Sequence, residues 1–260
     1  MKDAQDTLQS LVMAMPPITL EEMSSIRLMN RTDRKFVTNI SVLQDLLKLA
    51  QGEYYVQETC GRRMSPYSTT YWDGPERHEM FRNHLCGHSP RTKVRVRTYL
   101  DTKDTFLEIK KKDNHGRTRK KRVEVPSLEA VINDRAGEEF LEEISGYSFD
   151  EIKPTLGNRF HRITLVNFGK TERLTIDFGL HFYNYETALE ADMPDIVIIE
   201  LKRDGRVHSP ILPLLRELRI KPAGFSKYCI GTSVTNKEVK QNRFKPRLRK
   251  IDKIARRCKS

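Results

Sequence analysis

The stretch Lys93-Val-Arg-Val-Arg-Thr-Tyr99 decides the fold class, because charged side chains and valines alternate along it. Successive residues of a β-strand point to opposite faces of the sheet. One face of this predicted strand therefore carries Lys93, Arg95, Arg97 and Tyr99, and the other carries Val94 and Val96. Taken alone, such a strand is typical of a sheet with one face in water.

Four further predicted strands repeat this alternation, and their polar faces are mostly basic. They are 106–112 (FLEIKKK), 117–125 (RTRKKRVEV), 172–178 (ERLTIDF) and 196–202 (IVIIELK). Like charges on neighbouring strands repel, whereas ordinary solvated faces mix the two signs. The last strand is apolar on both faces up to Glu200, which predicts an interior strand with one carboxylate. A buried carboxylate needs a partner or a metal ion.

A closed antiparallel β-barrel with flanking helices, an α+β fold, reconciles the two kinds of face. The apolar faces would pack against outer helices, and the charged faces would line the lumen. An empty lumen rich in Lys and Arg is electrostatically costly, and a polyanion whose phosphates accept bidentate Arg contacts would stabilise it. A carboxylate among the cations suits a hard divalent ion that also binds phosphate and water. The residues alone thus predict an oligophosphate and a metal ion.

The remaining segments support an antiparallel α+β fold, because strands and helices do not alternate as in a parallel α/β fold. Capping boxes or apolar periodicity predict helices over 19–22, 41–52, 127–145 and 211–220, with Ser41–Gln44 as the capping box of the second. Turns between neighbouring strands are expected at 114–116 and 167–169. We divide the chain into an N-terminal lead (1–18), one barrel domain (19–235) and a basic tail (236–260).

The net charge of +12 is concentrated at the C-terminus, where residues 236–260 hold +9 and leave +3 for residues 1–235. The nearly balanced body argues against nucleic acid as a partner, except through the tail. We expect the tail to be a solvated, partly helical end, with contact to a polyanion as the alternative. The sequence gives no indication of an oligomeric state.

The 260-residue chain shows no sign of membrane insertion or secretion. No apolar run approaches the roughly 18–20 residues of a membrane span, and the N-terminus does not resemble a signal peptide. The cysteines Cys60, Cys86, Cys229 and Cys258 have no paired spacing, so we expect reduced thiols and a cytoplasmic location. Cys229 is interpreted as a small apolar filler rather than a nucleophile.

Six segments carry a family resemblance in the right order. They are MNRTDRKFV (29–37), Arg95 and Arg97 in RVRTY, FLEIKKK with the basic cluster after it, RLTID (173–177), IIELK (198–202) and FSKYCIG (225–231). Together they resemble the polyphosphate polymerase domain of the vacuolar transporter chaperone (VTC) type, one of the CYTH-like triphosphate tunnel metalloenzymes. The resemblance covers about 19–234. It implies a tunnel-shaped antiparallel β-barrel and, as in eukaryotic members, transfer of the ATP γ-phosphate to a growing polyphosphate chain.

The resemblance also implies residue roles. By position, the phosphate-binding basic residues are Lys35, Arg95, Arg97, Lys110, Lys120, Arg162, Arg173 and Lys227. Glu200 would bind Mn²⁺ or Mg²⁺, and Ser226 and Lys202 are additional candidates for binding ATP. Neighbouring cations compete for two of the roles: Arg119, Lys121 and Arg122 with Lys120, and Arg159 with Arg162. We expect Asp177 and Glu108 to form salt bridges with lumen cations, with metal binding by Asp177 as the alternative.

Two other functions stay open from the sequence. Hydrolases of triphosphate compounds in sister families usually carry an early Glu-x-Glu-x-Lys strand, whereas Arg31-Thr-Asp-Arg-Lys35 lacks the glutamate pair and favours the polymerase. A non-catalytic module that binds polyphosphate is the third possibility. His84, Cys86 and His88 resemble part of a zinc site, but no second ligand cluster is visible, so a structural or surface role is favoured.

Overall fold

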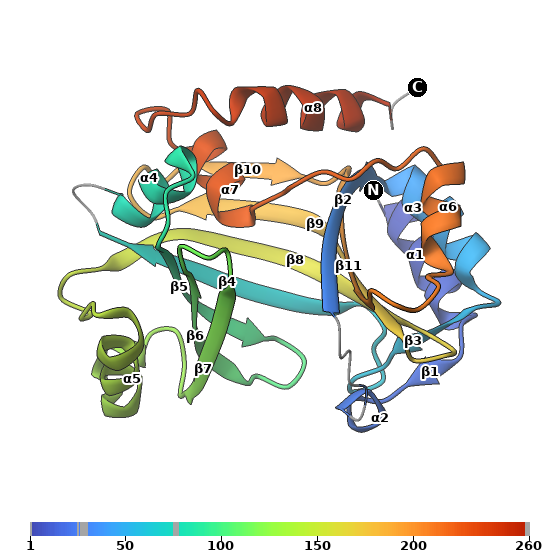
Figure 1. The fold of residues 1–260 in the computed structure, drawn as a ribbon, viewed down its shortest axis with the longest axis horizontal. Coiled ribbons are helices and arrows are strands. Elements are labelled where there is room, and N and C mark those ends of the chain that lie inside the picture. The colour runs from blue at the N-terminus through green and yellow to red at the C-terminus, as the bar shows by residue number, and fades with distance from the viewer. Residues whose placement is uncertain (1, 25, 27–30, 75–77, 258–260) are drawn as a thin grey trace.

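The computed structural model describes residues 2–24, 26, 31–74 and 78–257. Met29, Asn30 and Cys258, which the sequence analysis used, lie outside these ranges. One eleven-stranded, largely antiparallel sheet dominates the fold, and helices surround it (Figure 1). The strands are β1 (Pro17–Ile18), β2 (Arg31–Asn39), β3 (Tyr54–Gln57), β4 (Ser65–Asp73), β5 (Arg91–Tyr99), β6 (Thr105–Lys112), β7 (Thr118–Val125), β8 (Lys153–Asn167), β9 (Glu172–Asn184), β10 (Glu190–Met193) and β11 (Ile196–Asp204). The helices are α1 (Lys2–Met13), α2 (Leu20–Ser24), α3 (Ile40–Ala50), α4 (Glu79–Cys86), α5 (Arg135–Ser145), α6 (Ile211–Glu217), α7 (Lys227–Thr235) and α8 (Lys245–Arg256).

The sheet is curved but open, so the expected antiparallel α+β tunnel fold is confirmed and its full closure is wrong. The strand order is β2-β11-β9-β8-β4-β5-β6-β7, and β2 and β7 at its two ends do not pair with each other. Part of the free edge of β2 pairs instead with the segment after α6. Phe36 forms a β-bridge with Pro222, and the amide of Ala223 donates to the carbonyl of Lys35 at 2.9 Å. A strand edge used in this way is not available to β7.

The outer face of the central strands packs against α1, α3 and α6, which gather on one side of the sheet (Figure 1). Leu43, Leu46 and Leu47 of α3 are fully buried there, as the leucine spacing predicts. α3 begins one residue before Ser41, because the side chain of Asn39 caps it by accepting the Val42 amide at 3.0 Å. Ser41 is therefore not the cap, since its hydroxyl donates to that same Asn39 side chain.

Two other helices are shorter than the sequence predicts. α5 begins at Arg135 rather than near 127, because the Asp134 carboxylate caps it by accepting the Gly137 amide at 2.8 Å. A single 3-10 turn (Val131–Asn133) precedes it. α6 ends at Glu217 rather than at 220, since Arg219 has a φ of 54° and reverses the chain. The short helix after Thr19 has the predicted reciprocal capping bonds between Thr19 and Glu22.

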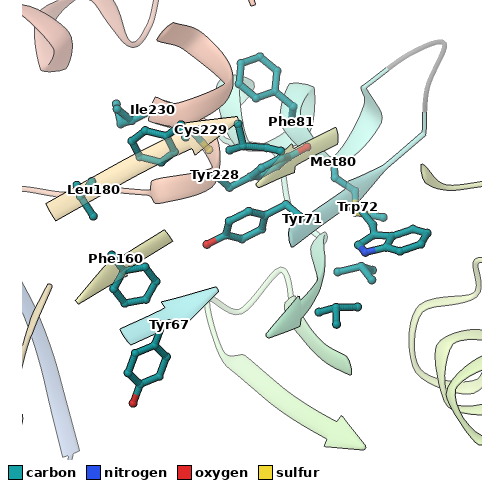
Figure 2. Close-up of a cluster of buried hydrophobic side chains, with 14 of the residues drawn as sticks. Tyr67, Tyr71, Trp72, Met80, Phe81, Phe160, Leu180, Tyr228, Cys229 and Ile230 are labelled. Carbon is teal, nitrogen blue, oxygen red and sulfur yellow. The ribbon is translucent and has the colours of Figure 1, made fainter. Parts of the chain in front are cut away.

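α7 lies against the inner face of the sheet and fills one end of it with apolar side chains (Figure 2). Leu180, Phe182 and Phe160 from β9 and β8 are buried in the same cluster as Tyr228 and Ile230 of α7. The tail adds α8, whose Ile251 belongs to this cluster. The inner face is therefore apolar at this end and available to a ligand only beyond it.

Both ends of the chain contribute to these cores. Leu8 and Val12 of α1 are buried with α3, although the three-part division of the chain stays a prediction. The thiols of Cys60, Cys86 and Cys229 are free, and Cys229 is buried in the apolar cluster. Within the described ranges, no helix combines the length and apolar character needed to cross a membrane.

Gly231 is required by the close approach of α7 to the sheet. A Cβ at this position would lie 2.5 Å from Phe182 Cδ1 and 2.7 Å from Leu156 Cδ2. We expect Gly231→Ala to lower the free energy of unfolding by about 2–3 kcal/mol, because a packed core resists added volume. Urea denaturation measures the loss. Gly52→Ala is the control, since a Cβ there meets nothing within 4 Å, and equal stability of the two variants would contradict the packing argument.

Candidate functional site

The inner face of the sheet beyond α7 surrounds a cavity of about 790 Å³. The alternating strands place their charged faces toward it and their apolar faces away, as predicted: Arg95 and Arg97 line it, whereas Val94 and Val96 are buried in the core. Its lining includes eleven cationic side chains, namely Lys35, Lys93, Arg95, Arg97, Lys110, Lys120, Arg122, Arg162, Arg173, Lys202 and Lys227. Its carboxylates are Asp101, Asp104, Asp177 and Glu200.

All residues that the sequence analysis assigned to phosphate, ATP or metal binding line this one cavity. They come from β2, β5, β6, β7, β8, β9, β11 and the start of α7, so segments far apart in the sequence converge. Their individual roles stay predictions. Among the competing cations, Lys120 and Arg122 both line the cavity, whereas Arg119, Lys121 and Arg159 are not part of its lining. Lys93 lies on the predicted charged face and also lines the cavity, although no sequence motif indicated it as a site residue.

Glu108 holds three strands together beneath the cavity floor. Its side chain is fully buried on β6, with one carboxylate oxygen 2.7 Å from Nε of Arg95 on β5 and the other bonded to Lys120 on β7. Burial alone would raise the pKa of Glu108, but the charges of Arg95, Arg97 and Lys120 outweigh it and hold this pKa well below its usual range. The expected salt bridge is confirmed, and it neutralises part of the charge of two predicted phosphate ligands.

Asp177 makes the equivalent connection on the other side of the cavity. Arg162 of β8 approaches it in a bidentate arrangement, with Nε at 2.6 Å and Nη2 at 2.8 Å, and Lys227 of α7 bonds to Oδ2. Burial would raise the pKa of Asp177, but Arg162 and Lys227 lower it well below its usual range. The carboxylate is thus engaged by cations, in agreement with its expected salt bridge.

Among the described residues, five of the eleven cations lack a carboxylate hydrogen-bond partner: the exposed Lys35 and Arg122, and the more buried Lys93, Arg97 and Lys110. Lys93 Nζ donates to Ser226 Oγ at 3.1 Å, and burial lowers its pKa to about 8. Arg97 Nε donates to Thr69 Oγ1 at 3.1 Å, and the guanidinium lies over the Tyr67 ring. The charge of Arg95, together with burial, lowers the pKa of Lys110 to about 7. These side chains have charge and hydrogen-bonding capacity left for an anion.

Glu200 is the cavity carboxylate that fits a metal ion. It lies on β11 opposite Lys35 of β2 and Thr175 of β9. Burial would raise its pKa, but Lys35, Lys202 and other cations lower it, so the carboxylate is ionised at neutral pH. No salt bridge within 4.0 Å joins it to another described residue. One carboxylate with phosphate and water as the other ligands is a usual arrangement for Mg²⁺.

The described residues offer no alternative metal centre. No group of three or more His, Cys, Asp or Glu side chains among them could hold an ion. His84 of the HLCGH segment is packed near the Tyr228 ring, and burial lowers its pKa to about 3. His84 is thus half-buried beside an aromatic ring, and the structural or surface role of that segment stays a prediction.

We expect Asp177→Asn to destabilise the protein by about 3 kcal/mol, because it leaves Arg162 and Lys227 buried without their counter-charge. The pKa of Asp177 is lowered by folding, so its contribution is complete above the unfolded pKa near 4 and is lost as the pH falls below it. The variant should therefore show a shallower acid-induced loss of stability in urea titrations. The control is Asp45→Asn in the exposed pair with Lys48, and a similar profile for both variants would contradict this role.

Burial lowers the pKa of Lys93 to about 8. Bound phosphate favours the ammonium form, so binding above that pH requires proton uptake. We expect the affinity for tripolyphosphate to fall above pH 7, where Lys110 begins to lose its proton, and to fall more steeply above pH 8, by up to about a further tenfold per pH unit. Lys93→Arg should remove the additional fall above pH 8, because arginine stays charged. Calorimetry in two buffers of different ionisation enthalpy measures the proton uptake. Lys121→Arg on the outer face is the control, and an unchanged pH profile for Lys93→Arg would refute the assignment.

Comparisons with known proteins assign the chain to a family and list structures that are similar to it. A crystal structure of a candidate adenylate cyclase from Bacillus halodurans is 11% identical, with a TM-score of 0.48 and coverage of 76% of this chain and 96% of that one. HpAC1 from Hippeastrum, described as having a dominant triphosphatase activity, is 13% identical, with a TM-score of 0.44 and coverage of 78% and 97%. The curated proteins include no match to the sequence. A model of the VTC domain family matches residues 30–236, and the chain therefore belongs to the VTC domain family.

Proposed function

We propose that this protein is an ATP-dependent polyphosphate polymerase, which transfers the γ-phosphate of ATP to the end of a polyphosphate chain. The observation that carries the proposal is the convergence of eleven cationic side chains on one cavity. The same cavity contains an ionised Glu200 that forms no salt bridge with a described cation. So many like charges around one space are stabilised by a ligand with several negative groups. Family membership supports a substrate of the triphosphate or polyphosphate class.

The residues would act mainly by holding and neutralising phosphates. Phosphoryl transfer needs in-line placement and stabilisation of charge rather than covalent chemistry from the protein. Arg97, Lys93 and Lys110 have the free capacity to bind phosphate oxygens, while Arg95 and Arg162 are oriented by their carboxylates. The attacking terminal phosphate is ionised near neutral pH, so the reaction needs no strong general base.

The divalent metal of the proposal would be held by Glu200, together with phosphate oxygens and water. Mn²⁺ or Mg²⁺ bound there would neutralise negative charge on the phosphates. Asp177 and Glu108 are poor candidates for this role, because cations already occupy their oxygens.

Two other functions would use the same cavity residues and the same class of anion. A hydrolase would transfer the phosphate to water, but its usual glutamate pair is absent from the start of β2, where Arg31 and Asp33 precede Lys35. A non-catalytic module would bind the same anions without metal-dependent loss of the γ-phosphate. The products formed from ATP distinguish all three.

Purified protein incubated with ATP and Mn²⁺ should form phosphate polymers that a gel resolves. We expect Glu200→Gln to reduce the rate at least about 100-fold, as removal of a group that stabilises transferring charge does. Glu143→Gln on exposed α5 is the matched control. Free phosphate without polymer would favour the hydrolase, and ATP binding without turnover would favour the module.

Arg95→Ala should also stop turnover. The melting temperature of this variant should fall as well, because Arg95 neutralises the buried Glu108.

A further inference from the structure

The cavity is blocked at the end where α7 lies. Ser226 and Lys227 line that end, and directly behind them the inner face is filled by Tyr228, Ile230 and Leu180 (Figure 2). Seven of the nine residues of α7 are buried, and Ile251 of α8 packs on the same cluster. A polyphosphate chain in the cavity cannot continue through this apolar core, because its charges would lose their hydration without gaining partners.

The opposite end of the cavity is less suited to a long polyanion. Its lining there includes the apolar side chains Leu20 and Met23 of α2 and the carboxylates Asp101 and Asp104 after β5. Asp101 lies 3.4 Å from Arg62, which offsets part of its charge. Arg173 also lies at this end, since its Nη2 donates to the Met23 carbonyl at 3.2 Å. An extended chain of phosphates would therefore meet cationic, apolar and acidic groups together there.

The side of the cavity between β2 and β7 has the opposite character. These two strands end the sheet and do not pair with each other. Both contribute cations to the lining, Lys120 and Arg122 from β7 and Lys35 from β2, whose Nζ also donates to the Phe225 carbonyl at 3.3 Å. Cations here are more exposed than those on the inner strands of the sheet. The Lys120 side chain is 38% exposed, against 13% for Arg95 and 17% for Arg162.

We propose that long polyphosphate chains enter and leave the cavity sideways, through the gap between the end strands β2 and β7, beside the Pro222–Ala223 segment that covers part of the β2 edge. This inference rests on the proposed function, since it concerns the same site and the same class of substrate. A chain bound in this way needs no free end to thread, because an internal segment can lie between Lys35 and Arg122 while the rest stays in water. When phosphate is added to the chain in the cavity, the closed α7 end prevents the chain from advancing in that direction. The growing polyphosphate therefore moves outward through the gap, past Lys35 and Arg122.

Long-chain polyphosphate with both terminal phosphates coupled as phosphoramidates to a carrier protein tests this access. The carrier is too large for the cavity, so the blocked chain can bind only through an internal segment. We expect it to bind within about threefold of the unblocked chain in the absence of ATP. A loss of about 30-fold or more would overturn sideways access while leaving the proposed function intact. Failure of the unblocked chain to bind would refute both.

Substitutions on β7 provide a second test. Arg122→Glu reverses a charge in the gap, whereas Arg119→Glu makes the same change on a β7 residue that does not line the cavity. We expect Arg122→Glu to weaken long-chain binding about tenfold or more and tripolyphosphate binding only about threefold, because the short anion sits deeper. Arg119→Glu should change neither by more than about twofold. Equal losses for long and short anions in Arg122→Glu would contradict the proposal.

Discussion

Two buried carboxylates allow this fold to keep eleven cations around one cavity. Glu108 joins β5, β6 and β7 through Arg95 and Lys120, and Asp177 joins β8, β9 and α7 through Arg162 and Lys227. Without them, neighbouring strands would present like charges to each other in a region of low dielectric, where repulsion is strong. The two carboxylates therefore allow strands that carry many cations to lie side by side in a curved sheet. Asp177 also attaches α7, the element that blocks the cavity, to the sheet.

Seven of the eleven cations fall into two classes according to these ion pairs. Arg95, Lys120, Arg162 and Lys227 have a fixed partner and a fixed orientation before any ligand binds. Lys93, Arg97 and Lys110 have none among the described carboxylates, and burial or neighbouring charge lowers their pKa values. An anion that binds the second class removes a cost that the folded protein bears when empty, so ligand binding and stability are coupled. Oriented and unsatisfied cations side by side suit a ligand with several phosphates.

The sequence predicted the local parts of this arrangement and missed the long-range ones. Alternation along 93–99 and 172–178 is a property of each strand alone, so the inner faces and the pairing of Asp177 could be foreseen. The failure of the sheet to close could not be foreseen, because it depends on Pro222 and Ala223, which pair with β2 from almost 190 positions away in the sequence. Lys93 follows the alternation but belongs to none of the family segments, and its place in the cavity lining and its contact with Ser226 of the α7 N-cap reveal it. Ser41 failed as a cap because Asn39, two residues earlier, offered a better-placed acceptor.

A β-bulge sets where the cavity ends and the apolar core begins. Thr175 and Asp177 of β9 face the cavity, whereas Leu180 and Phe182 face α7, although strict alternation would send even-numbered residues to the outer face. Between positions 178 and 181, β9 contains one more residue than its partner β8, which passes from Arg159 to His161. Gly179, with a φ of +62°, accommodates the extra residue. One inserted residue thus turns apolar side chains inward and converts a channel that could have run through the sheet into a cavity with one closed end.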